Sequence, residues 1–421
     1  MATPTTRPRI GLLGKIVIAI ILGIVCGQFF PSWLSRSFVT FNSVFSQYLK
    51  FAIPLIIVGL VTPAIAELGK GAGKWLGITA AIAYGSTIFS GLLAWVTCVL
   101  VFPMILSQGS VAKLDNPEDH ALAPFFKIEI PPMFGVMTAL VLSFVLGVAL
   151  TVIKGRTLMG AFVDLRDAIE WMIRATLIPL LPLYIFGIFL DMTQNGQITT
   201  VISTFAKVIV VAFALTVVLL LIQWSIGGAM IGKNPLGLLK NMLPAYATAL
   251  GTSSSAATIP VTLGCVKKNG IPDAIASFVV PLCATIHLAG STMKIVCFSL
   301  AIMTITGQPI EFGPYMGFIL MLGITMVAAP GVPGGAIVAA LGILQSMLGF
   351  DETAQALMIA MYIAVDSFGT ACNVTGDGAI ACVIARLSRG QIGEGAPVHE
   401  DTQGHILLDP PARAEGEATP A

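Results

Sequence analysis

Nine runs of residues in this chain carry almost no charge, and most are long enough to cross a lipid bilayer. They lie at roughly 10–30, 43–66, 75–105, 131–153, 175–190, 208–232, 274–306, 312–350 and 352–385. A transmembrane helix needs about 20 consecutive apolar residues. Of the 421 residues, 56% are hydrophobic and 10% are charged, and a soluble protein has about 25% charged residues. The sequence therefore predicts an all-α membrane protein.

Lysine and arginine residues between the runs predict the orientation. Most of them fall in loops that would share one side: Arg7, Arg9, Lys15, Lys70, Lys74, Lys154, Arg156, Lys233, Lys240, Lys267, Lys268, Arg386 and Arg389. Arg36, Lys113 and Lys127 fall on the other side. Because cytoplasmic loops carry excess Lys and Arg, we expect both termini in the cytoplasm of a plasma-membrane protein. Residues 391–421 are rich in Gly, Pro, Glu and Ala, and we expect a disordered tail there.

Two stretches do not fit simple spanning helices. Residues 244–260 contain a Gly/Ser run and lie between Lys240 and Lys267, which are both assigned to the cytoplasmic side. The uncharged run 312–350 is too long for one helix and is broken by Pro and Gly at 328–335. We interpret both as re-entrant helical hairpins that enter and leave the membrane on one side.

Each hairpin precedes a helix with a polar interruption. The two interruptions align as His-Leu-Ala-Gly-Ser at 287–291 and Asn-Val-Thr-Gly-Asp at 373–377. Such a pattern is typical of inverted repeats around a midplane binding site in secondary transporters. Channels also use re-entrant loops, so the pattern leaves a channel open as an alternative.

Two carboxylates and one amide occupy a segment that must cross the membrane. Asp366, Asn373 and Asp377 are spaced i, i+7 and i+11, so they share one helical face. An Asp at the centre of a membrane helix costs about 2.5–3.5 kcal/mol. Such groups persist where they face protein, water or a bound ion, and this face is the first candidate for a substrate and cation site.

Four ordered motifs give the chain a resemblance to a known family. They are Thr252–Pro260, Pro281–Ile286, Gly331–Gly334 and Asn373–Asp377, within roughly residues 235–389. With them the chain resembles the dicarboxylate/amino acid:cation symporters, which include the glutamate transporters. The resemblance implies eight transmembrane helices plus two re-entrant hairpins, a homotrimer and an elevator mechanism. It also implies a scaffold at about 8–70 and 131–198, and a moving transport part at about 74–105 and 200–389.

The resemblance also implies residues that bind substrate. Asp366 would bind the amino group, and Ser255 and Asn373 would bind the α-carboxylate. Ser254 and Val332 would add amides at the hairpin tips, and the expected set is completed by Ser291, Gly369 and Thr370. Two alternatives stay open: Asp366 pairs with Lys294 inside the protein, and the serines at 253–255 serve the loop alone.

Sodium sites are implied in the same way. One site would use Asn373 and Asp377 with backbone groups of Cys283 and His287. A second would use Thr285 with the backbone carbonyls near Val327 and Ala329. Hard cations prefer such oxygen ligands. The alternative for Asp377 is a carboxylate that carries a proton.

Three positions depart from the family pattern. Gly369 stands where acidic-substrate members hold an arginine, the side chain best suited to clamp a carboxylate. Ala289 lacks the carboxylate of a third sodium site, so we expect fewer coupled sodium ions. Lys294 lies in an apolar run, seven residues after His287, and is a candidate for coupling.

The sequence therefore predicts a sodium-driven symporter for a small neutral amino acid. A dicarboxylate or acidic amino acid symporter of the same fold, driven by sodium or protons, is the first alternative. No metalloprotease, hydrolase-triad or nucleotide-loop motif supports an enzyme, and we expect no cofactor other than the coupling ion. The net charge of +1 indicates no nucleic-acid partner. The seven cysteines mostly lie in apolar runs and are interpreted as packing residues.

Overall fold

The computed structural model describes residues 12–69, 74–107, 123–153, 156–196, 198–329, 333–388, 398–400 and 406–408. Apart from two three-residue strands, every regular element in these ranges is helical. In the described ranges, six helical segments are long and apolar enough to cross a membrane: 32–66, 74–105, 157–194, 201–231, 273–305 and 366–388. Shorter apolar helices cover 14–27, 138–152, 312–327 and 335–348. The expectation of a helical membrane protein is confirmed at this level.

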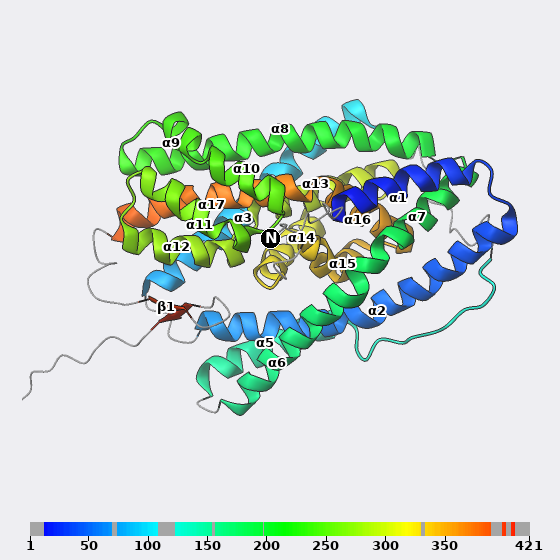
Figure 1. Ribbon diagram of the computed structural model, residues 1–421, viewed down its shortest axis with the longest axis horizontal. Helices are drawn as coiled ribbons and strands as arrows, with labels where there is room; N and C mark the ends of the chain where they lie inside the picture. The colour runs from blue at the N-terminus through cyan, green and yellow to red at the C-terminus, as the bar shows by residue number, and fades with distance from the viewer. Residues whose placement is uncertain are drawn as a thin grey trace, which may run out of the picture.

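One group of helices comes from the first half of the chain. It comprises α1 (Leu12–Gly27), α2 (Ser32–Gly69), α5 (Val136–Val152), α6 (Thr157–Met172), the π-helical turn η1 (Ile173–Leu177) and α7 (Ile178–Gln194). Helix α1 packs along α7, and α2 packs against α5, α6 and α7 (Figure 1). The expected run 175–190 is only the second half of a longer helical segment. Pro179 lacks the N–H that would bond to Ala175, which accounts for the π-turn that joins α6 to α7.

A second group surrounds the polar segments. Helix α3 (Lys74–Ile105) packs against α13 (Ala289–Ile305), and α8 (Ile198–Ile231) packs against α17 (Asp366–Ser388). Figure 1 shows α8 along the top of the molecule, over α10 and α13. Helix α12 (Asp273–Ile286) lies against α17, and α16 (Glu352–Ala364) contacts α13 and α15. Every residue of α13 is buried, including its polar ones.

Two helical hairpins pack into this group. In the first, α10 (Leu243–Thr252) and α11 (Ser255–Lys268) contact each other and α17, after the short helix α9 (Pro235–Asn241). Ser253 turns the chain with a left-handed backbone (φ 50°), and Ser254 caps α11 by accepting from the Ala257 N–H. In the second, α14 (Phe312–Val327) packs against α15 (Gly335–Leu348), and Gly334 takes the left-handed turn (φ 76°).

The two expected helix interruptions have different outcomes. The first is confirmed, because α12 ends at Ile286 and α13 begins at Ala289. The second is wrong, because α17 runs without a break from Asp366 to Ser388. The break in this helix comes earlier, at Val365 (φ −125°, ψ 13°), between α16 and α17. A buried lysine that donates to the Val365 carbonyl satisfies the acceptor that this break exposes.

Residues 391–421 contain a feature that the sequence did not predict. Strand β1 (Val398–Glu400) pairs antiparallel with β2 (Ile406–Leu408). Two strands alone are marginally stable in water. The other residues of the expected disordered tail lie outside the described ranges.

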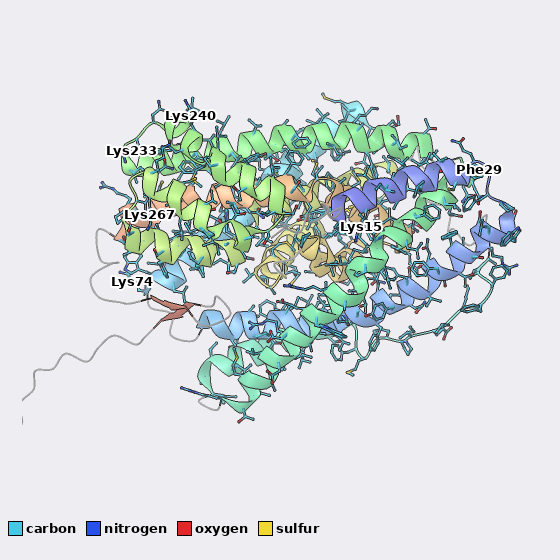
Figure 2. All side chains as sticks on the ribbon, in the orientation of Figure 1. Lys15, Phe29, Lys74, Lys233, Lys240 and Lys267 are labelled. Atoms are coloured by element: carbon cyan, nitrogen blue, oxygen red, sulfur yellow. The ribbon has the colours of Figure 1, made fainter. Side chains whose placement is uncertain are left out.

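The labelled lysines fall into two sets. Lys74, Lys233, Lys240 and Lys267 lie at one end of the long axis, and Phe29 lies at the other end (Figure 2). Lys15 belongs to helix α1 instead of a loop, and Figure 2 places it between the two ends. The four clustered lysines follow the grouping expected from the positive-inside pattern, and Lys15 does not.

Candidate functional site

The candidate site lies where several helices begin or end inside the molecule. The first turn of α13, the N-terminal half of α17 and the start of α15 meet there through hydrogen bonds. Backbone groups at helix ends are not paired within the helix, and they need side-chain partners or a ligand. This arrangement supplies polar groups in a region where the surrounding helices are apolar.

Asp366 opens α17 and joins it to the second hairpin. Its Oδ2 accepts a hydrogen bond of 2.8 Å from the Gly334 N–H, at the N-cap of α15. A carboxylate is favoured there by the dipole of α15. The buried Tyr362 hydroxyl lies beside the same carboxylate and can donate a second hydrogen bond to it. Asp366 is 8% exposed.

Asn373 ties α17 to the start of α13. Its Oδ1 accepts from the N–H groups of Gly290 (2.8 Å) and Ser291 (3.3 Å). Its Nδ2 donates to the Ser291 hydroxyl oxygen at 3.0 Å. The sequence expected Asn373 and Ser291 in one site, and the structure brings them into contact. Most of the hydrogen-bonding capacity of the Asn373 amide is used inside the protein, which leaves one N–H donor for a ligand.

Lys294 reaches the same place from α13. Its Nζ donates to the Val365 carbonyl at 2.9 Å and lies 5.8 Å from the centre of the Phe368 ring. An ideal Cβ built on Gly369 would lie 3.4 Å from Lys294 Nζ and 3.5 Å from Ser291 Oγ. The ammonium therefore occupies the space beside residue 369. No ion pair within 4.0 Å joins Lys294 to Asp366, although their charges are close enough to interact.

A second polar group surrounds Asp377. The His287 Nδ1 lies 2.8 Å from Asp377 Oδ1, and both side chains are fully buried. The His287 Nε2 lies 3.0 Å from the Ser86 hydroxyl, which also accepts from Gln223 Nε2 at 3.0 Å. Where the resemblance implied backbone groups of His287 for sodium, the structure places its imidazole directly on the carboxylate. A cation at Asp377 must share that carboxylate with the imidazole.

Several expected site residues have other contacts in this structure. Ser254 caps α11, and Thr370 donates to the Asp366 carbonyl in its own helix (3.3 Å). Thr285 is exposed and donates to the Leu282 carbonyl (2.8 Å), and the Cys283 carbonyl accepts the His287 N–H (2.9 Å). No hydrogen bond to the Ser255 hydroxyl is recorded among the described residues. Val327 ends α14, Ala329 follows it, and Val332 lies outside the described ranges.

Comparison with known proteins decides the family. The family model described as the sodium:dicarboxylate symporter family matches residues 12–387. This chain belongs to the sodium:dicarboxylate symporter family. The protein is therefore a membrane transporter and not an enzyme, with sodium as its coupling ion. The expected family and class of function are confirmed.

Curated relatives within this symporter family match along nearly their whole length. The serine/threonine transporter SstT of Acinetobacter baylyi is 27% identical over 407 residues, which cover 90% of this chain and 98% of the relative. SstT of Streptococcus thermophilus is 25% identical over 394 residues, covering 90% and 97%. SstT of Streptococcus agalactiae is 26% identical over 389 residues, covering 88% and 94%.

The sequence did not predict four of the groups at this candidate site. Ser86 and Gln223 contact the His287–Asp377 pair, and the Gly334 N–H and the Val365 carbonyl bind Asp366 and Lys294. Gln223 could have been found, because it is the only carboxamide in the apolar run 208–232. The two backbone groups leave no signal in a sequence.

Proposed function

We propose that this symporter moves a small neutral amino acid into the cell with sodium. The observation that carries the proposal is the buried Asp366 carboxylate, which accepts from the Gly334 N–H and has no ion pair within 4.0 Å to a described residue. A desolvated carboxylate is a strong partner for an ammonium group. The curated relatives named as serine/threonine transporters support a substrate of this class.

A neutral substrate is favoured over an acidic one by the side-chain charges. Gly369 contributes no cation, and Lys294 is the one Lys or Arg recorded near Asp366 within the described ranges. A substrate with two carboxylates and one ammonium would leave one anion without its own partner, which costs several kcal/mol in a dry site. Dicarboxylates would in addition face the Asp366 carboxylate.

For sodium, we propose Asp377 as the main ligand of one site, with Asn373 and the backbone near Cys283 and His287. The carbonyl oxygen of Gln223 supports a cation here. It is buried without a hydrogen-bond partner in the described part of the chain, and it lies 2.7 Å from an ideal Cβ on Gly376. Amide and carboxylate oxygens suit a hard cation.

A second sodium site, at Thr285 with the carbonyls of Val327 and Ala329, is part of the same proposal. Helix α12, which carries Thr285, contacts α14, which ends at Val327. Ala289 adds no carboxylate at the start of α13. We therefore propose fewer than three sodium ions per cycle.

We also propose the finer architecture: eight transmembrane helices, two re-entrant hairpins and a homotrimer in which the transport part moves past the scaffold as an elevator. The scaffold would hold residues 8–70 and 131–198, and the transport part 74–105 and 200–389. Packing supports this division, because α1, α2, α5, α6 and α7 contact one another extensively. Helices α3, α8, α12, α13 and α17, with the first hairpin, form the other group. The lysine cluster of Figure 2 supports cytoplasmic termini.

Uptake into proteoliposomes tests the proposed function. We expect L-serine, L-threonine or L-alanine to accumulate under an inward sodium gradient and not when choline replaces sodium. Asp366→Asn keeps the size of the side chain but removes the charge, and it is expected to lower uptake at least about 100-fold because a buried charged pair is lost. Accumulation of aspartate or succinate in preference to the neutral amino acids would overturn the proposal.

A further inference from the structure

Positive charge is concentrated at one end of the helices that surround the polar segments. The exposed cations there are Lys74, Lys233, Lys240, Lys267, Lys268 and Arg386, and Figure 2 labels four of them. Among the side chains that the structure describes in this group of helices, the exposed carboxylate at this end is Asp273, 3.1 Å from Lys267. This end of the molecule therefore carries an excess of positive charge, which fits an anionic partner.

Helix α9 presents one of these cations between two apolar side chains. Leu236, Lys240 and Leu243 are spaced i, i+4 and i+7, so they share one helical face. Met242 keeps a right-handed helical backbone (φ −85°, ψ −8°), which carries this spacing from α9 into α10. Leu236 is 63% exposed and Leu243 is 55% exposed, whereas Leu238 and Met242 are buried. The outward face of α9 is therefore apolar, cationic and apolar in turn.

Lys233 adds a second cation just before this helix. Its Nζ donates to the Asn269 carbonyl at 2.7 Å, which ties the loop before α9 to the base of the first hairpin. In the described part of the chain, no ion pair within 4.0 Å is recorded for Lys233 or Lys240. A lysine ammonium carries three N–H donors. Both side chains can therefore donate to the oxygens of an anion.

The preceding helix indicates where this surface lies in the bilayer. Helix α8 is apolar enough to span a membrane, and Val217, Leu221 and Ile226 are exposed on it. Lys233 follows the end of α8 at Ile231 by two residues. The cations therefore begin where the apolar span ends, which is the depth of the lipid headgroups. Leucine side chains at that depth contact acyl chains, and lysine side chains reach the phosphates.

We propose that Lys233 and the outward face of α9, formed by Leu236, Lys240 and Leu243, bind the headgroup of an anionic phospholipid. The two ammonium groups pair with the phosphate, and the two leucines contact the acyl chains. A zwitterionic headgroup would bring its own ammonium into a region that is already positive, so the surface favours lipids of net negative charge. Because α9 leads directly into the first hairpin, the lipid is held by the part of the molecule proposed to move. This inference does not depend on which substrate is carried.

The test compares dioleoylphosphatidylglycerol with dioleoylphosphatidylcholine, which have the same acyl chains and differ in headgroup charge. Binding to the purified full chain in a neutral detergent is measured by native mass spectrometry and by the lipid-dependent rise in melting temperature. The wild type is expected to bind phosphatidylglycerol more tightly, with a preference that falls as salt screens the charges. Lys233→Gln with Lys240→Gln is expected to weaken phosphatidylglycerol about 25-fold, or about 5-fold for each lysine, and to leave phosphatidylcholine unchanged.

Control variants separate headgroup binding from misfolding. Glutamine at position 233 keeps a donor for the Asn269 carbonyl, so the variant loses the charge and can keep that hydrogen bond. Lys207→Gln is the matched control, because Lys207 is an exposed lysine on α8 whose Nζ also donates to a backbone carbonyl, that of Ile105, at 2.8 Å. It is expected to leave the lipid preference unchanged. Leu236→Ser with Leu243→Ser is expected to weaken both lipids by a common factor.

Three results would overturn the inference. The first is a wild type that binds the two lipids equally. The second is a Lys233→Gln, Lys240→Gln variant that melts like the wild type without lipid and keeps the full preference for phosphatidylglycerol. The third is an equal rise in melting temperature with inorganic phosphate at matched ionic strength, which would assign the lysines to a soluble anion. A preference that is lost in the lysine variant, kept in Lys207→Gln and absent with phosphate supports a lipid site.

Discussion

The Asp377 carboxylate lies in the part of α17 that crosses the membrane, where it contacts the imidazole of His287. The His287 ring bridges it to the Ser86 hydroxyl, and Gln223 holds that hydroxyl in turn. A chain of this kind fixes the carboxylate in one orientation. It also sets the cost of removing any single member, because the groups left behind are buried.

His287→Ala is therefore expected to destabilise the protein by about 1–3 kcal/mol, the cost of leaving a buried polar group without its hydrogen-bond partner. Thermal unfolding in detergent measures the change. His287→Asn keeps a donor near Asp377 and should recover part of the loss. Ser86→Ala removes only the outer contact and should cost about 1 kcal/mol. Equal melting temperatures for His287→Ala and the wild type would show that Asp377 does not rely on this ring.

The contact between α13 and α17 is set by a glycine. An ideal Cβ on Gly290 would lie 2.6 Å from Cys372 Cβ and 2.8 Å from the Gly369 carbonyl oxygen. The two helices can approach this closely only because residue 290 has no side chain. The same approach lets the Gly290 N–H reach Asn373.

Gly290→Ala should separate these helices and cost about 1–3 kcal/mol through overpacking. It should also weaken substrate binding, because the Gly290 N–H would leave Asn373. Gly85→Ala in α3 is the matched control, since an added Cβ there meets nothing within 4 Å. That control is expected to be neutral or to stabilise the helix by up to about 1 kcal/mol. Similar melting temperatures for the two variants would contradict the close-contact argument.

The first turn of α15 offers a second comparison at the level of an element. Gly334 and Gly349 flank α15, and both have left-handed backbones (φ 76° and 67°). Alanine at either position should cost about 1–2 kcal/mol in backbone strain. Only Gly334 donates to Asp366, so Gly334→Ala should also reduce sodium-driven uptake, and Gly349→Ala should lower the melting temperature alone. Equal uptake in the two variants would show that the Gly334–Asp366 contact does not contribute to substrate transport.

The sequence predicted the helices more accurately than the positions at which they are interrupted. The hairpins and the interruption at 287–288 could be found, because Gly, Pro and polar residues there cannot continue an apolar helix. The break before α17 was misplaced, since Asn373 and Gly376 look like an interruption while Val365, which breaks the helix, looks regular. A lysine distant in sequence satisfies the Val365 carbonyl, so the cause of the break is tertiary.

The same distinction holds for the site. Asn373, Ser291 and Asp377 were predicted because their side chains are polar in apolar runs. The pairing of His287 with Asp377 was not, because it depends on how α13 and its preceding turn pack on α17. The local sequence pattern around each residue carries no information about the distance between His287 and Asp377.

At the scale of the whole molecule, one half-buried ion pair joins the two groups of helices in the described part of the chain. Lys50 on α2 lies 2.7 Å from Glu352 at the start of α16. If the transport part moves past the scaffold, this pair must separate in every cycle. A pair that solvent still reaches contributes about 0–1 kcal/mol, so it is no obstacle to motion.

A crosslink at this pair should therefore stop transport. In a Cys26→Ala background, where the six remaining native cysteines are buried, Lys50→Cys with Glu352→Cys is expected to lose uptake after treatment with a short bifunctional thiol reagent. Lys267 and Asp273 form a matched pair, 3.1 Å apart, between α11 and α12 of the proposed transport part. The same crosslink there should leave uptake intact. Transport that survives the first crosslink would contradict relative movement of the two groups.

In this structure the Gly334 N–H donates to the carboxylate that is proposed to bind the substrate. The backbone N–H occupies one oxygen of the carboxylate proposed to receive the substrate's ammonium. Energetic coupling between two binding events is reciprocal, so an ammonium that weakens this bond must also be held less tightly while the bond persists. The affinity for substrate and the strength of the Gly334–Asp366 hydrogen bond are thus energetically linked. Selection for tighter substrate binding would therefore also change how strongly Asp366 holds the start of α15.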